Sequence, residues 1–125
     1  MTMGPVTWEA RQGRAVWGGR ALSDWANDLV VGLVAAFDPL EVWLYGSVAR
    51  GDDDVDSDID LLLVLDSYDP ATAVDLKQQA SRSSTAPVPF DVAFTDMGRM
   101  RRRRRIAGTL ERAAVNEGRR IYQRD

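Results

Sequence analysis

Residues 43–64 read WLYGSVARGDDDVDSDIDLLLV, and this stretch decides both the fold and the chemistry of the chain. Its pattern predicts a strand over residues 42–45, a tight turn at Gly46 and Ser47, an acidic loop, and a second strand over residues 58–65. Beyond its first residues the second strand is apolar on both faces, which is typical of a central strand covered on each side.

Asp58 and Asp60 stand two residues apart at the start of the second strand. Because side chains at i and i+2 of a strand share a face, with Cα atoms about 6.5–7 Å apart, the two carboxylates should converge. Carboxylate oxygens suit Mg²⁺, which keeps several waters and shares its other positions with substrate phosphates. At the turn, Gly46 permits close backbone approach, and Ser47 offers a hydroxyl and a backbone N–H where a short helix could begin. The stretch therefore predicts a metal and phosphate site.

Three other interpretations of these residues are weaker. Residues 46–51 have the glycine spacing of a P-loop, but two aspartates follow where Lys and Ser or Thr belong. An EF-hand loop beginning at Asp54 would need Gly and Glu at positions that here hold Ile59 and Leu65. A solvated acidic turn would not explain why the carboxylates continue into a strand, where unpaired charge is costly.

The residues Gly46-Ser47, Arg50-Gly51 and Ser57-Asp58-Ile59-Asp60 resemble the Gly-Ser-x-x-Arg-Gly-x5-Ser-Asp-x-Asp signature of the DNA polymerase β-like nucleotidyltransferases. The match is most similar to the minimal nucleotidyltransferase (MNT) group, many members of which are antitoxins paired with HEPN-domain toxins. The resemblance extends to about Tyr122, although only the motif region is specific. It implies an α/β (α+β) fold, in which a small mixed sheet is packed with helices.

The same resemblance implies a third carboxylate from a following strand, and Asp91 is the best candidate. Residues 87–94 predict that strand, and its two prolines place it at the edge of a sheet. Phe90, Val92 and Phe94 share one face of it, which leaves Asp91 on the other. A structural hydrogen-bonding role for Asp91 is the alternative. Asp96, at the end of the strand, is better explained as a helix N-cap.

The length and amino-acid composition of the chain further limit the chemistry that it can perform. A chain of 125 residues is expected to form a single domain, with no separate substrate-binding domain. It contains no cysteine and no histidine, which excludes disulfides, thiolate chemistry, a Ser-His-Asp triad and His-ligated zinc. The longest apolar run is too short to span a bilayer and no export signal is apparent, so the cytoplasm is the expected compartment. Catalysis must therefore depend on carboxylates and cations.

Charge is distributed unevenly along the chain. Residues 1–98 carry a formal charge of −10 and residues 99–125 a charge of +7, which together give the net charge of −3. Such asymmetry suggests that one end of the domain meets cations and the other meets anions. The arginines of residues 99–105 are most simply a solvated helical face, and no aromatic residues are interleaved with them for single-strand stacking. Of the specialised roles, contact with an acidic partner or with nucleotide phosphates is favoured over sequence-specific nucleic-acid binding.

The remaining segments complete the predicted domain. Residues 22–37 have the apolar stripe of an amphipathic helix, with Ser23 or Asp24 as its cap. A second helix is expected over residues 70–81, with Ala73, Val74 and Leu76 facing inward. Residues 99–125 predict one basic helix, with Ile106, Leu110, Ala113 and Ala114 as its apolar stripe and Gly118 as its stop, followed by a short strand. Residues 1–20 are poorly defined, although Trp8 and Trp17 are expected to pack on the core.

These observations predict a Mg²⁺-dependent nucleotidyltransferase that moves a nucleoside monophosphate, AMP from ATP in the favoured form, to a hydroxyl. Two Mg²⁺ ions (or Mn²⁺) would be held by Asp58, Asp60 and Asp91, and Asp91 could also accept the proton. Ser47 and nearby backbone N–H groups would hold phosphates, with Gly46 and Ser57 completing the nucleotide site. Arg50 would either contact phosphate or brace the acidic loop.

The acceptor is less constrained by the sequence. The MNT resemblance implies a HEPN toxin, neutralised by binding and by AMP transfer to one of its hydroxyl side chains. One alternative is a non-catalytic antitoxin or interaction module that retains the motif as scaffold. Another is a stand-alone small-molecule adenylyltransferase, which a deep apolar acceptor pocket would favour.

Overall fold

The computed structural model describes residues 8–11 and 14–125, with side chains from Ala15 onward. The strands are β1 (Trp8–Arg11), β2 (Arg14–Trp17), β3 (Arg20–Ala21), β4 (Glu41–Tyr45), β5 (Ile59–Leu65), β6 (Phe90–Asp96) and β7 (Arg119–Gln123). The helices are α1 (Leu22–Phe37), α2 (Gly46–Arg50), the 3₁₀ turn η1 (Pro70–Thr72), α3 (Ala73–Arg82), α4 (Met97–Arg103) and α5 (Leu110–Glu117). No helix among these residues is long and apolar enough to cross a membrane.

The core of the fold is a four-stranded mixed sheet in the order β6-β5-β4-β7. Strands β4 and β5 are antiparallel, β5 and β6 are parallel, and β7 pairs antiparallel with the other side of β4. As the apolar run predicts, β5 is central, and its Leu61, Leu62, Leu63 and Val64 are fully buried. The proline-flanked β6 lies at an edge, as expected.

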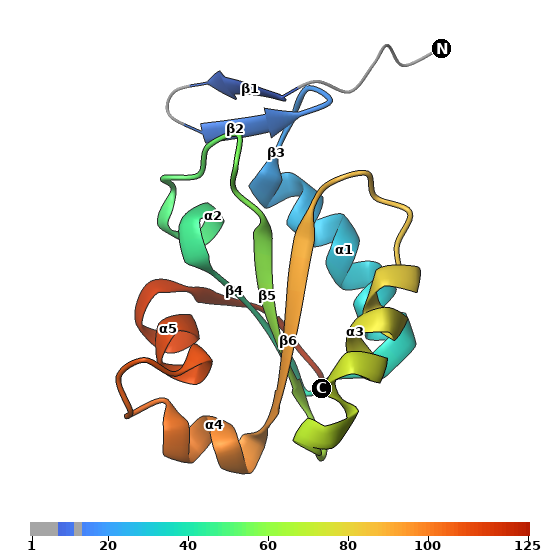
Figure 1. The fold of residues 1–125 in the computed structure, drawn as a ribbon, viewed down its shortest axis with the longest axis vertical. Helices are drawn as coiled ribbons and strands as arrows, with labels where there is room; N and C mark the ends of the chain where they lie inside the picture. The colour runs from blue at the N-terminus through green and yellow to red at the C-terminus, as the bar shows by residue number, and fades with distance from the viewer. Residues whose placement is uncertain (1–7, 12–13) are drawn as a thin grey trace.

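Helices cover both faces of this sheet (Figure 1), with α1 and α3 on one side and α4 and α5 on the other. The first face carries the larger cluster, in which Ile59, Leu61 and Leu63 of β5 meet Leu29 and Leu33 of α1. The second face carries a smaller cluster that includes residues of β4, β5, α4 and α5: Tyr45, Leu62, Val64, Ala93, Met100 and Ala114. The expected mixed α/β architecture is thus confirmed.

The helix predicted over residues 22–37 is confirmed at both ends. It buries Leu22, Trp25, Ala26, Leu29 and Leu33 along one stripe. It ends at Asp38, which adopts the left-handed conformation with φ 46° ahead of Pro39. Its N-cap is Ala21 without a side-chain hydrogen bond, so neither Ser23 nor Asp24 caps it.

Two predictions about later helices are wrong. Val74 was expected to face inward, but it is 68% exposed, because α3 turns Ala80 toward the core; Leu76, also expected to face inward, is partly buried there. The single basic helix expected after Arg99 is divided into α4 and α5, since the chain turns between Arg104 and Thr109 and Thr109 caps the new helix through the Arg112 backbone N–H.

The predicted apolar stripe of that segment is correspondingly incomplete. Ile106 and Leu110 are 52% and 46% exposed, whereas Ala114 is buried and Ala113 packs beside it. The turn between the two helices removes Ile106 from the helical register that the stripe assumed. The short closing strand exists as β7, and Asp96 caps α4 by accepting the Arg99 backbone N–H, both as predicted.

Gly118 ends α5 for a reason other than the left-handed stop that the sequence suggested. Its φ is −101°, but a Cβ there would lie 2.2 Å from the Leu44 carbonyl oxygen and 2.6 Å from that of Ala114. Both obstacles are backbone, so only glycine lets α5 pass into β7 beside β4.

We expect Gly118→Ala to destabilise the fold by about 2–3 kcal/mol, because a forced shift of β7 against β4 is overpacking that side-chain rotation cannot relieve. Urea denaturation would measure this change in the free energy of unfolding. The matched variant Gly19→Ala has no atom within 4 Å of the added Cβ and carries only the cost of its positive φ. Equal losses in the two variants would contradict the close-approach explanation.

Residues 1–20 were poorly defined from sequence, and the described residues 8–11 and 14–21 form a three-stranded antiparallel sheet, β1-β2-β3. Ala15 and Val16 of β2 are buried, and Trp17 packs partly against the main core as expected. The prediction for the Trp8 side chain falls outside the residues whose side chains are described. At the top of Figure 1 this small sheet lies near the loop that leads into β5.

Candidate active site

Asp60 occupies the second position of β5, at the end of the sheet where β4 finishes and β6 begins. Its neighbours across the ladder are Tyr45 in β4 and Asp91 in β6. Directly paired residues project their side chains to the same face of a sheet, so the Asp60 and Asp91 carboxylates are neighbours on one face. The parallel pairing begins just before them, where the Ile59 backbone N–H donates to the Pro89 carbonyl at 3.1 Å.

The Gly46 turn lies directly against Asp60. Gly46 has φ 75°, and a Cβ added to it would be 2.2 Å from Oδ2 of Asp60. The chain passes from Tyr45 into the short helix α2 at this point, as the sequence suggested, and Ser47 follows as a partly exposed residue. The bend and the carboxylate are therefore in contact, and glycine is required for that contact.

The electrostatics of Asp60 locate its acidic neighbours. Its pKa is raised to about 6, first by burial and then by the negative charges of Asp91 and Asp58, with Arg50 acting in the opposite direction. Burial and the charges of Asp60 and Asp91 likewise raise the pKa of the Tyr45 hydroxyl. Asp58 and Asp91 thus both lie close enough to act on Asp60 at one end of the sheet, where ionising Asp60 is unfavourable.

Asp91 is the most exposed of the paired carboxylates because β6 is an edge strand. Its side chain is 52% exposed, and its Oδ1 accepts from Nζ of Lys77 in α3 at 3.3 Å. Beside it lies a small hollow of about 190 Å³, lined by Lys77, Ala80, Ser81, Phe90, Asp91 and Val92. Lys77 supplies the positive charge closest to this carboxylate.

Arg50 braces the acidic loop in this structure. Its guanidinium contacts Asp52 at 3.2 Å and Glu117 of α5 at 2.9 Å, and these partners raise its pKa further. Of the two roles considered for Arg50, this is the bracing one, while a contact with phosphate remains a prediction.

Ser57 likewise stabilises the loop. The Asp54 backbone N–H donates to the Ser57 Oγ at 2.9 Å, and that hydroxyl donates to Oδ1 of Asp54 at 3.2 Å. The loop before β5 is therefore folded on itself, which sets the direction in which Asp58 enters the site. The nucleotide-binding role expected for Ser57 stays a prediction.

Asp53 is a structural residue that sequence reasoning did not distinguish from its acidic neighbours. It is 2% exposed, and its Oδ2 accepts the Ala15 backbone N–H at 2.8 Å. The bond joins the acidic loop to β2 and so connects the N-terminal sheet to the site. Nothing in the run of aspartates marks Asp53, since its partner is 38 residues away in sequence.

Comparison with known proteins identifies the family. The family model described as "Polymerase beta, Nucleotidyltransferase" matches residues 32–125, which contain every predicted site residue. The chain belongs to this polymerase β nucleotidyltransferase family. A crystal structure from Sulfolobus solfataricus, of a protein provisionally named a nucleotidyltransferase, is similar with a TM-score of 0.55 and 25% identity, over 81% of this chain and 79% of that one. No curated protein matches the chain significantly.

The protein is accordingly a nucleotidyltransferase of the polymerase β family. Enzymes of this family generally use a nucleoside triphosphate and divalent metal. Within residues 15–125, no three acidic side chains are grouped closely enough to form a ready-made metal site. The donor chemistry nevertheless fits a hard cation, because carboxylates predominate and Asp60 is crowded by two like charges that a cation would neutralise.

Proposed function

We propose that this polymerase β family nucleotidyltransferase transfers AMP from ATP, with Mg²⁺, to a hydroxyl on a partner protein. The supporting observation is the pairing of Asp60 with Asp91 on adjacent strands, with the Gly46 bend pressed against Asp60. Carboxylates near the starts of two adjacent strands, with a glycine bend beside them, match the needs of phosphoryl chemistry, which is mostly positioning and charge stabilisation.

In this proposal Asp58, Asp60 and Asp91 hold the metal, which when bound would activate the hydroxyl and neutralise charge on the triphosphate. The Gly46–Ser47 backbone and the Ser47 hydroxyl hold the phosphates. Asp91 is the most accessible of the strand carboxylates to an incoming acceptor, and its Oδ1 or Oδ2 receives the hydroxyl proton. Arg50 keeps the acidic loop in place through Asp52 and Glu117.

The ion pair between Lys77 and Asp91 should compete with metal. We expect Lys77→Gln to bind Mg²⁺ or Mn²⁺ about two- to fivefold more tightly, because an exposed ion pair is worth up to about 1 kcal/mol and must open when the carboxylate becomes a ligand. Calorimetric titration with Mn²⁺ measures this change.

The matched control for that titration is Gln78→Glu, which alters charge next to Lys77 on an exposed part of α3. Long-range attraction alone would make this variant bind metal more tightly as well, and by a similar factor. Unchanged or weaker binding by Lys77→Gln would contradict a ligand role for Asp91.

The acceptor is proposed to be a separate protein, a HEPN toxin, so that the chain acts as an MNT-type antitoxin. The hollow beside Asp91 supports this choice, because its volume of about 190 Å³ is smaller than the roughly 300–1,000 Å³ typical of small-molecule pockets. Asp91 is also half exposed, within reach of a hydroxyl presented on another protein surface.

The decisive experiment is label transfer. The protein is incubated with α-labelled ATP, Mg²⁺ and the product of the neighbouring reading frame, and label is sought on that product. Label that is lost in Asp58→Asn and Asp60→Asn supports the proposal. A tight complex without label would instead favour a non-catalytic antitoxin, and label on small metabolites would favour a stand-alone adenylyltransferase.

A further inference from the structure

A second pocket lies at the opposite end of the sheet from the carboxylates. It has a volume of about 400 Å³ and is lined by Glu41, Trp43, Met97, Met100, Arg101, Arg104, Arg105, Val115 and Arg120. We call it the arginine pocket. Glu41 pairs with Val64, four residues along β5 from Asp60, which corresponds to about 13 Å along the strand. The pocket is therefore distinct from the site proposed above, and the motif residues do not contribute to it.

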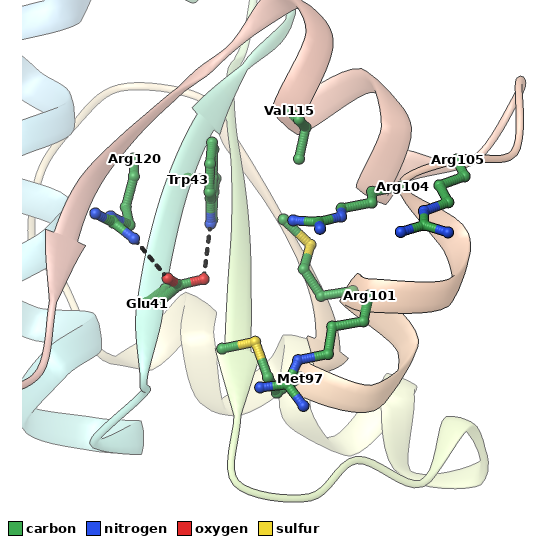
Figure 2. Close-up of a pocket in the computed structure, with 9 residues that line it drawn as sticks. Glu41, Trp43, Met97, Arg101, Arg104, Arg105, Val115 and Arg120 are labelled. Carbon is green, nitrogen blue, oxygen red and sulfur yellow. Dashed lines mark hydrogen bonds and ion pairs between the residues drawn. The ribbon is translucent and has the colours of Figure 1, made fainter.

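The wall of the pocket is fixed by a buried acid. Oε1 of Glu41 accepts the indole N–H of Trp43 at 3.2 Å, and its Oε2 accepts from Arg120 at 2.9 Å (Figure 2). Glu41 is only 8% exposed, so these two bonds satisfy it and fix how the Trp43 ring stands. Figure 2 shows the ring edge-on, with one flat side toward Met97 and Arg104.

The opposite rim carries positive charge that the protein does not neutralise. Arg101, Arg104 and Arg105 project from α4 and the turn after it, and all three are exposed. Among residues 15–125, no acidic group forms an ion pair with any of them, whereas Arg99, Arg103 and Arg120 each have a carboxylate partner. Three like charges at the rim of one pocket favour a ligand with several negative charges.

A ligand that fills the pocket should match both its positively charged rim and its flat apolar wall. Planar guanidinium groups bind phosphate oxygens in pairs, and a flat apolar wall of indole and thioether groups favours an aromatic ring. The volume lies in the range of small-molecule sites, which is roughly 300–1,000 Å³. A nucleoside polyphosphate combines an aromatic base with several charges at that size.

We propose that the arginine pocket binds a nucleoside polyphosphate, with its base against Trp43 and its phosphates against Arg101, Arg104 and Arg105. This is a second nucleotide site, separate from the catalytic carboxylates. The arginines themselves supply the countercharge, so binding here does not require a divalent cation. At the carboxylate end the opposite holds, since Asp58, Asp60 and Asp91 repel phosphate unless a metal intervenes.

The different requirement for a divalent cation at the two sites provides the test. The whole protein, in the Asp60→Asn background and in excess EDTA, is titrated with ADP by calorimetry and by tryptophan fluorescence. We expect saturable one-to-one binding that weakens as salt is added. Replacing Arg101, Arg104 and Arg105 with Gln should weaken it by about tenfold or more, because charge-assisted bonds to phosphate are lost. Trp43→Phe should remove most of the fluorescence change.

The control is Arg102→Gln, which removes one positive charge beside Arg101 on α4 at a position that does not line the pocket. It should bind ADP within about twofold of the parent, as expected for screened charge at a distance. Among the residues that the structure describes, none forms a side-chain hydrogen bond or ion pair with the three replaced arginines, so the fold should be retained, and thermal melting checks this.

Four outcomes would overturn the proposal. Absence of ADP binding in EDTA at millimolar concentration would do so, as would an equal loss in Arg102→Gln and the triple variant. Pyrophosphate binding as tightly as ADP would reduce the pocket to an anion site that does not recognise the base. A single-stranded oligonucleotide that binds at least tenfold more tightly than ADP would assign the pocket to nucleic acid instead. Because Asp60 is already replaced, failure here leaves the proposed transferase activity untouched.

Discussion

Asp60→Asn should reduce nucleotidyl transfer by about 10³-fold or more while leaving the protein folded. The substitution keeps the shape of the side chain and removes the charge that is proposed to hold the metal between Gly46 and Asp91. Losses of several kcal/mol in transition-state stabilisation are typical when a group that acts on developing charge is removed. Label transfer from ATP to the partner protein measures the rate, with Asp56→Asn as the control in the same acidic loop, where the side chain is exposed.

The same variant should be more stable than the parent when metal is absent. The pKa of Asp60 is raised to about 6, so ionisation at neutral pH works against the folded state. On a half-exposed group, a pKa shift of this size lowers the free energy of unfolding at neutral pH by about 1 kcal/mol, after allowance for solvent screening. In EDTA the melting temperature of Asp60→Asn should exceed that of the parent by about 3 °C at pH 8.

The pH dependence of that difference follows from the direction of the shift. Above pH 6 Asp60 is ionised in both folded and unfolded chains, and the full penalty is present. As the pH falls toward 4 the folded protein takes up the proton first, so the penalty is relieved and the two melting temperatures should converge. A parent protein that is the more stable of the two at pH 8 in EDTA would show that Asp60 is not electrostatically crowded.

Gly46→Ala should have the second largest effect, a loss of activity of about 10²-fold or more with a smaller loss of stability. The new methyl group would meet Oδ2 of Asp60 at 2.2 Å. A carboxylate can rotate away, so the fold survives, but it rotates out of the position opposite Asp91. Misplacing a reacting or metal-holding group by about 1 Å can cost about 10² in rate.

The variant Gly108→Ala is a control that separates displacement of the Asp60 carboxylate from backbone strain. Gly108 has φ 87°, close to the 75° of Gly46, and an added Cβ there meets nothing within 4 Å. Both variants should therefore lose about 1–2 kcal/mol from the left-handed backbone conformation, while only Gly46→Ala loses activity. Urea melts and label transfer on the two proteins measure the two quantities. If Gly108→Ala were equally inactive, contact with Asp60 would not be the cause.

The central part of the fold could be predicted from sequence because its signals are local. The alternating and continuous apolar runs identified β4, β5, β6 and α1, and the proline pair correctly placed β6 at an edge. The proximity of Asp60 and Asp91 could not be predicted from such local signals. The family resemblance implied that a carboxylate from a following strand joins Asp58 and Asp60. The register that places Asp91 beside Asp60 depends on a parallel pairing across α3, which the strand pattern did not determine.

The parts that were missed depend on contacts between distant segments. Asp53 is one of six aspartates in a short run, and only its burial beneath β2 separates it from the others. Val74 violates the apolar pattern because neighbouring elements leave that face of α3 uncovered, and Ile106 violates it because it lies in the turn between α4 and α5. The arginine pocket was hidden for the same reason, since its aromatic wall comes from β4 and its cations from α4, two segments that the sequence keeps far apart.

The parallel pairing of β5 with β6 also has a kinetic consequence. A whole helix and its flanking loops separate the two strands, so closing them into register costs chain entropy before any contact compensates for it. Hairpin-like pairing of β4 with β5 is the more local event and should precede it. The acidic pair of the enzyme would then assemble only after β4 and β5 have paired, so that chains folded no further than that hairpin are catalytically silent.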